Sequence, residues 1–337
     1  MKKNFKNLSA ALAAAFLGLA AGGPLAAQQS RADQIRQVQD AIKAKGARWV
    51  AGETSVSDLP EEEWLYKVGL GFTEQKGAPV EGLDERGAPP ALDWRDNGGN
   101  YVTPVRDQKK CGGCWAFAMT GGLESYSLRN AHRPGADLNL SEQVMISCSG
   151  VGSCNGGTLN ADYLQSTGLP EESAYPYTGT DGTCSAAASG WQNSTYTIGS
   201  WGSVPKSVSG LKAALAKYGP LPTAMMVYED FMHYKSGVYS YTSGKKLGGH
   251  AVLLVGYDDA DQAFIVKNSW NTGWGERGFF RIAYSEMTSP VSFGLSTIAY
   301  TGSPRGVAEL GRQASAGRNS DGTWARVAPM FAAAAAW

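Results

Sequence analysis

A cysteine at the start of a predicted helix is the residue in this sequence best suited to nucleophilic chemistry. Cys114 directly precedes the apolar run WAFAM, and the segment 114–130 has the pattern of a helix. The thiolate is the reactive form of cysteine, and a helix N-terminus together with a neighbouring imidazolium stabilises it. The position of Cys114 therefore predicts an activated nucleophile.

The base for such a nucleophile is expected among three histidines. His132 lies in a polar turn and His233 in a segment that favours a surface or structural role, whereas His250 begins the apolar strand HAVLLVGYD. If segments 250–259 and 262–270 form a hairpin about Asp259, His250 and Asn268 lie opposite each other and make contact. An amide oxygen then orients the imidazole and leaves its second nitrogen for Cys114.

Two further residues are candidates for the same site. Trp270 follows Asn268 by two residues and shields the His–Asn hydrogen bond from water, unless it is an ordinary core tryptophan. Gln108 precedes Cys114 by six residues, close enough for its amide to donate to a developing oxyanion beside the backbone N–H of Cys114. Taken alone, a loop glutamine is usually exposed to solvent.

The ends of the chain differ in composition from its centre. Residues 1–27 place lysines before an Ala/Leu-rich run and small residues, which predicts an export signal cleaved near Ala27 rather than an uncleaved membrane anchor. The leader's composition suggests a bacterial protein, either secreted or periplasmic, without stable membrane association. Residues 303–337 are rich in Gly, Ala and Ser and are expected to form a flexible C-terminal tail.

The region between these ends divides in two. Residues 28–90 are rich in charge and contain one short amphipathic helix, with Ile35, Val38 and Ile42 on its apolar face, followed by an exposed Gly/Pro-rich linker. In residues 91–302, predicted helices over 114–130, 140–149 and 209–219 precede most of the strand signals, so the fold class is α+β. Basic and acidic residues number 30 each, which disfavours nucleic acid as a partner.

The chain contains five cysteines, an odd number for an exported protein. These are Cys111, Cys114, Cys148, Cys154 and Cys184. Disulfides persist in oxidising compartments, so two bridges are expected to leave one free thiol. That thiol is either reactive or incidental.

Four segments in a fixed order resemble the papain-like cysteine peptidase family. They are QKKCGGCWAF, CNGG at 154–157, GGHAVLLVGYD and KNSWNTGWGERGFFRI, and the resemblance spans about residues 91–300. It implies a two-lobe fold, with a helical N-terminal lobe, a β-barrel-like C-terminal lobe and the active-site cleft between them. It also implies that Cys114 is the nucleophile, His250 the general acid/base, Asn268 its orienting partner and Gln108 the oxyanion donor.

The resemblance carries further implications for binding and for disulfides. It implies bridges Cys111–Cys154 and Cys148–Cys184, and a peptide backbone bound at Gly156 and Gly157. The main specificity pocket, lined by Leu159, Ala224, Gly249 and Ile298, favours an apolar side chain two residues before the scissile bond. The chain lacks the His-bearing insertion of carboxydipeptidase relatives, so we expect an endopeptidase acting on peptides or proteins, monomeric and without a cofactor.

Residues 28–90 resemble a short propeptide of the cathepsin B type, with Trp49, Ala51 and Gly52 carrying the likeness. Such a segment, running IRQVQDAIKAKGARWVAGETSVSDLP, is expected to lie through the cleft as an inhibitor. The alternative is a mobile N-terminal extension.

Other classes of function start from the same residues. CGGC is a Cys-x-x-Cys motif and is compatible with a thiol–disulfide oxidoreductase, in which Cys111 and Cys114 would form the bridge. A papain-like fold kept for binding alone would have lost a catalytic residue, and none is lost here. A metal site is disfavoured because the three histidines are scattered along the chain.

Overall fold

The computed structural model describes residues 30–71 and 77–304. The expected signal peptide, residues 74–76 of the predicted linker and nearly all of the predicted tail lie outside these ranges. Within the described residues, none of the helices combines the length and apolar character needed to cross a bilayer.

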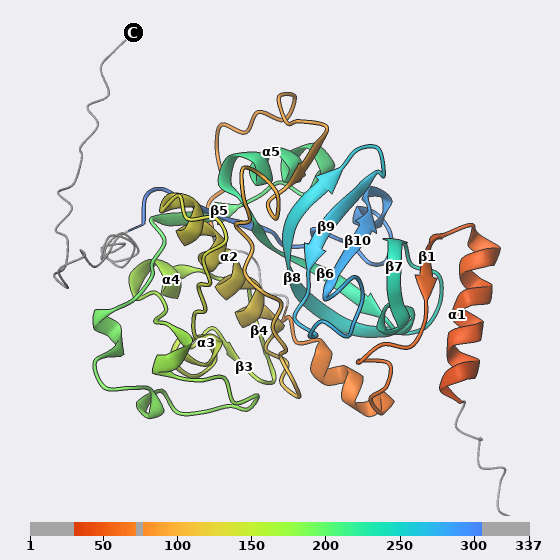
Figure 1. Ribbon diagram of the computed structural model, residues 1–337, viewed down its shortest axis with the longest axis horizontal. Coiled ribbons are helices and arrows are strands. Elements are labelled where there is room, and N and C mark those ends of the chain that lie inside the picture. The colour runs from red at the N-terminus through yellow and green to blue at the C-terminus, as the bar shows by residue number, and fades with distance from the viewer. Residues whose placement is uncertain (1–29, 72–76, 305–337) are drawn as a thin grey trace, which may run out of the picture.

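The described chain folds around two hydrophobic cores. Figure 1 shows α2, α3 and α4 on one side of the molecule and the large sheet on the other. The α-helices are α1 (Arg31–Lys45), α2 (Cys114–Asn130), α3 (Glu142–Cys148), α4 (Asp162–Ser166) and α5 (Val208–Tyr218). The 3-10 helices are η1 (Glu61–Lys67), η2 (Glu172–Ala174), η3 (Cys184–Ala186), η4 (Trp191–Asn193), η5 (Glu229–His233) and η6 (Tyr284–Met287). The strands are β1 (Arg48–Ala51), β2 (Ala91–Asp93), β3 (Gly152–Ser153), β4 (Gly156–Gly157), β5 (Ser200–Ser203), β6 (Leu221–Tyr228), β7 (Tyr234–Tyr239), β8 (Lys246–Asp258), β9 (Ala263–Lys267), β10 (Phe279–Ala283) and β11 (Ile298–Thr301).

The predicted helices form where their capping residues place them. The bounds of α2 coincide with the predicted segment 114–130, and α3 begins after Ser141, whose hydroxyl accepts a hydrogen bond from the backbone N–H of Val144. The hydroxyl of Ser207 caps α5 in the same way, and that helix ends at Gly219 as expected. Each cap satisfies a backbone donor that the first turn of a helix leaves without a partner.

The β-rich lobe is built on one seven-stranded sheet. Its strands follow the order β1-β7-β10-β9-β8-β2, and β6 pairs with the first part of β8. The edge strand β1 comes from the N-terminal segment and runs antiparallel to β7, with α1 packed beside it (Figure 1). Because residues 30–71 are too few to form a robust core, they share the core of this lobe through Val38, Trp49 and Trp64.

The predicted register of the β8–β9 hairpin is wrong by two residues. Asp258 pairs with Ala263, so the turn is centred between Ala260 and Asp261 rather than on Asp259, and the register shifts again between Leu254 and Gly256. The residue opposite Asn268 is therefore Val252, and His250 is its diagonal neighbour. Diagonal neighbours on one face of a sheet remain within reach of long side chains, so the side chain of Asn268 still reaches His250.

Helix α2 lies close to the sheet because two of its residues have no side chain. A Cβ atom at Gly122 would lie 2.9 Å from Cγ of Pro222 and 3.0 Å from Cε2 of Tyr300, whereas one at Gly121 would lie 3.3 Å from a terminal methyl group of Leu253. Close packing thus explains the glycines that weaken this helix. The two positions differ, because the neighbours of Gly122 are rigid rings and that of Gly121 is flexible.

We expect Gly122→Ala to lower the free energy of unfolding and Gly121→Ala to leave it unchanged or raise it. Overpacking costs about 1–3 kcal/mol, while the higher helix propensity of alanine contributes about 1 kcal/mol in the opposite direction. Urea denaturation of both variants, in a Cys114→Ala background that prevents self-digestion, measures the difference. Equal midpoints for the two variants would contradict the packing argument.

Candidate active site

The predicted nucleophile lies at the boundary between the lobes. Cys114 is the first residue of α2 and is fully buried, and its Sγ accepts a hydrogen bond from the backbone N–H of Ala251 in β8 at 3.4 Å. Among the described residues it is the one cysteine outside a disulfide. The structure therefore brings the end of one lobe's helix against the strand that carries His250.

The predicted base and its partner are in direct contact. Nε2 of His250 lies 2.8 Å from Oδ1 of Asn268, and both residues are buried. Because an amide oxygen only accepts, the imidazole carries its proton on Nε2 and presents Nδ1 as an acceptor. Trp270 is fully buried and stacks on the imidazole, with ring centroids 4.8 Å apart. Trp270 thus covers one face of the imidazole that bonds to Asn268.

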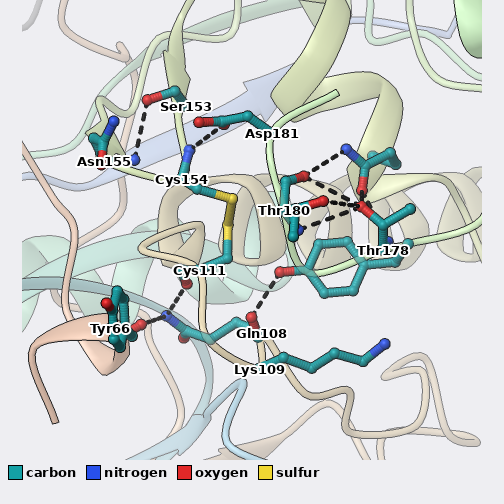
Figure 2. Close-up of a disulfide and its surroundings, with 12 residues drawn as sticks. Tyr66, Gln108, Lys109, Cys111, Ser153, Cys154, Asn155, Thr178, Thr180 and Asp181 are labelled. Atoms are coloured by element: carbon teal, nitrogen blue, oxygen red, sulfur yellow. Dashed lines mark hydrogen bonds between the residues drawn. A yellow bond between two sulfur atoms is a disulfide. The ribbon is translucent and has the colours of Figure 1, made fainter. Parts of the chain in front are cut away.

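The side chain of Gln108 makes three hydrogen bonds, of which Figure 2 shows those to Tyr66 and Cys111. Its Oε1 accepts a hydrogen bond from the hydroxyl of Ser269, while its Nε2 donates to the backbone oxygen of Cys111 and to that of Tyr66, each at 3.0 Å. Tyr66 belongs to the N-terminal segment. The amide of Gln108 is therefore already donating to a peptide carbonyl.

Both disulfides implied by the resemblance are present. Cys111 is bonded to Cys154, as Figure 2 shows, and Cys148 to Cys184. The first bridge joins the loop before α2 to the loop between β3 and β4. Because Cys111 is engaged with Cys154, the CGGC motif does not form the internal bridge that a dithiol exchange site requires.

The cleft is filled by residues 66–71 of the N-terminal segment. The backbone N–H groups of Gly69 and Leu70 donate to the carbonyl of Gly249, at 2.9 and 3.0 Å. The N–H of Gly157 donates to the carbonyl of Gly69 at 2.9 Å, and the N–H of Gly71 to that of Gly157 at 2.7 Å. These bonds satisfy the backbone groups at which an extended peptide was expected to bind.

The segment that enters the cleft differs from the one predicted. Trp49 lies instead at the edge of the sheet, where its indole N–H donates to the carbonyl of Ser240 and its ring packs on Tyr239. The cleft is too narrow for a side chain at Gly69 in the segment VGLG. A Cβ atom there would lie 2.2 Å from the backbone oxygen of Gly112. Glycines flanking Leu70 were a signal in the sequence that the prediction overlooked.

An apolar side chain of the N-terminal segment packs in the core that contains most of the predicted specificity residues. Leu70 is buried in one hydrophobic cluster with Leu159, Ala224 and Ile298. Gly249, the fourth predicted lining residue, contributes its carbonyl to Leu70, while Gly156 and Gly157 line the groove on the opposite side. Leu70 therefore shares its cluster with three of the predicted binding residues and its backbone contacts with a fourth, whereas Trp270 belongs to the other core.

Burial of the site changes the proton affinities of its reacting groups. It raises the pKa of the Cys114 thiol to about 12 and lowers the pKa of His250 to about 4, although the hydrogen bond to Asn268 acts in the opposite direction on the histidine. In this buried state both groups are therefore neutral between pH 5 and 8. Nucleophilic attack requires that water reach the site and that Cys114 and His250 form a thiolate–imidazolium pair.

These pKa shifts predict that Cys114 in the intact chain is alkylated slowly by iodoacetamide, at a rate that hardly changes from pH 5 to 8. A thiol with a pKa near 12 is protonated throughout that range, and a histidine with a pKa near 4 is not cationic and does not stabilise a thiolate. The rate should rise and follow a pH profile once residues 30–71 are removed. Fast alkylation of the intact chain would contradict this account.

Comparison with known proteins identifies relatives among the cysteine proteases. Residues 88–298 match the family described as papain family cysteine protease. A cathepsin L-like proteinase of Fasciola hepatica is 40% identical over 222 residues, which cover 61% of this chain and 64% of that protein. Thiol protease aleurain of Arabidopsis thaliana is 35% identical over 252 residues, covering 71% and 68% of the two chains.

A solved structure of digestive procathepsin L2 proteinase from Tenebrio molitor larval midgut superposes with a TM-score of 0.70 at 28% identity, covering 81% of this chain and 90% of that one. These three relatives come from eukaryotes, so they do not support the bacterial origin expected from the leader. The fold and the match over residues 88–298 show that the chain belongs to the papain family of cysteine proteases.

Proposed function

We propose that this protein is a secreted cysteine endopeptidase made as an inactive precursor, with Cys114 as nucleophile and His250 as general acid/base. The observation that carries the proposal is the free thiol of Cys114 at the start of α2, against the strand of the His250–Asn268 pair. Matches to cysteine proteases and to a procathepsin support the same conclusion.

The reaction follows from the atoms that the site provides. The thiolate attacks the peptide carbonyl, whose oxygen gains charge and is stabilised by Nε2 of Gln108 and the backbone N–H of Cys114. The carbonyl of Tyr66, now bound to that Nε2, stands in for the substrate oxygen. Imidazolium at His250 protonates the leaving amine, and water then releases the acyl group with the imidazole as base.

The division of the chain follows the same proposal. Residues 1–27 act as the export signal, 28–90 as the inhibitory propeptide, 91–302 as the peptidase domain and 303–337 as a tail. The contacts of Leu70 and Tyr66 in the cleft support the inhibitory role. Maturation is expected near Pro90, directly before β2, where the carbonyl of Pro90 accepts a hydrogen bond from the backbone N–H of Asp259 just after β8.

We expect Cys114→Ala and His250→Ala to abolish hydrolysis of a peptide with leucine two residues before the cleaved bond. Loss of either group should lower kcat at least about 1000-fold. Asn268→Ala should cost less, because it removes orientation and not the proton acceptor. His132→Asn is the matched control, since His132 is exposed and asparagine accepts its backbone conformation. Unchanged turnover by Cys114→Ala would disprove the proposal.

We expect the precursor carrying Leu70→Asp to become active faster than the wild type when incubated at mildly acidic pH with a reductant. A carboxylate in an apolar pocket without a partner is costly, so it weakens docking of the propeptide. Leu65→Asp is the control, because Leu65 is 57% exposed and its substitution buries no charge. Equal activation rates for the two variants would show that the pocket at Leu159 does not hold the propeptide.

A further inference from the structure

A cluster of charged side chains is buried directly behind the catalytic pair. Glu124 on α2 and Lys267 on β9 are 2% and 7% exposed. Both line a cavity of about 20 Å³, together with Arg106, Glu142, Asn268 and Ser269. None of the four charged groups has a role in the proposed reaction. Their position beside Asn268 raises the question of what they do.

Hydrogen bonds connect two members of this cluster through a hydroxyl. Nζ of Lys267 donates to Oγ1 of Thr103 at 3.0 Å, and the hydroxyl of Thr103 donates to Oε2 of Glu124. The other carboxylate oxygen of Glu124 accepts from the backbone N–H of Leu140 at 3.0 Å. The ammonium, hydroxyl and carboxylate thus form a continuous relay, in which Thr103 uses its donor and acceptor capacities at once.

The relay joins the two elements that carry the catalytic groups. Glu124 lies ten residues after Cys114 on α2, about 15 Å along the helix. Lys267 ends β9 and directly precedes Asn268. One end of the relay is therefore fixed to the helix of the nucleophile and the other to the backbone of the histidine's partner.

Asn268 depends on its backbone for orientation. Its Oδ1 accepts from His250 and from the N–H of Ser269, but its buried Nδ2 has no hydrogen-bond partner among the described residues. Because hydrogen bonds hold only the oxygen of this amide, the position of the Asn268 backbone sets the direction of its side chain. Whatever fixes Lys267 therefore also fixes the oxygen that faces the imidazole.

Stability alone is a weak reason for a buried charge cluster. Burial raises the pKa of Glu124 and lowers that of Lys267, and the attraction between the two opposes each shift. Burial together with the charge of Glu124 raises the pKa of Glu142 to about 8. The desolvation cost of such groups commonly equals or exceeds their mutual attraction. A hydrophobic contact would join the lobes at lower cost, but without directional bonds.

We propose that Lys267, Thr103 and Glu124 are positioning residues, whose relay across the lobe boundary holds Asn268, and through it His250, in register with Cys114. The inference rests on the proposed Cys–His–Asn reaction and adds to it the part of the structure that aligns its members.

Thr103→Val tests the relay, because it removes the hydroxyl while keeping the branched shape. In the mature enzyme we expect kcat to fall about 10- to 100-fold with KM unchanged, since misalignment affects the reacting groups and not the peptide-binding groove. The alkaline limb of the pH–rate profile should move to lower pH, because the hydrogen bond to Asn268 raises the pKa of His250. Thr103→Ser restores the hydroxyl and should retain wild-type values.

Tyr239→Phe is the matched control. Tyr239 also donates a buried hydroxyl to a buried carboxylate, that of Asp230 at 2.9 Å, but lies outside the relay. Its removal should leave kcat and the pH profile unchanged. Rates are expressed per active site, titrated with an irreversible thiol reagent, so loss of folded protein does not count as loss of turnover. If Thr103→Val gives no folded enzyme, Glu124→Gln takes its place with the same expected changes.

The outcomes separate the two proposals. No hydrolysis by the wild type, or full hydrolysis by Cys114→Ala, overturns the proposed function. With an active wild type, unchanged kcat and pH profile in Thr103→Val overturn the relay, as does an equal loss in Thr103→Ser. A fall in kcat confined to Thr103→Val, with the shifted alkaline limb, supports it.

Discussion

The packing of α2 against β8 holds the site together, because Cys114 begins the helix and His250 lies in the strand. The two residues come from lobes with separate cores, so neither lobe alone sets the distance between thiol and imidazole. Gly122 lets α2 approach the rings of Pro222 and Tyr300 closely. The backbone N–H of Ala251 in β8 donates to the thiol of Cys114. The buried relay from Glu124 to Lys267 adds a second connection further along the same helix.

The covered cleft follows from the need of buried backbone groups for partners. Gly157 and Gly249 have free N–H and carbonyl groups only when a peptide is absent, and residues 69–71 satisfy them with hydrogen bonds of ordinary length. Cys114 and His250 are fully buried in the same structure, and their burial raises the pKa of the thiol and lowers the pKa of the imidazole, which keeps both uncharged. The occupied groove and the uncharged catalytic pair therefore occur together in this structure.

Helices were predictable because their signals are local. Ser141, Ser207 and Gly219 act on neighbouring backbone groups, and the resulting bounds of α3 and α5 agree with the prediction to within a few residues. The hairpin register was not predictable in the same way. A bulge near Val255 and a turn displaced toward Asp261 depend on pairing with other strands, which a single segment does not reveal.

The sequence by itself determined which residue types were available for chemistry and their order: one cysteine left over from two disulfides, a histidine at a strand start, and an asparagine on the following strand. Tertiary structure alone decided that Asn268 reaches His250 diagonally, that Tyr66 and Leu70 and not Trp49 enter the cleft, and that Glu124 meets Lys267 through Thr103. Local patterns report hydrogen bonds between near neighbours, whereas these contacts join residues far apart in the chain and form only when the two lobes and the N-terminal segment pack together.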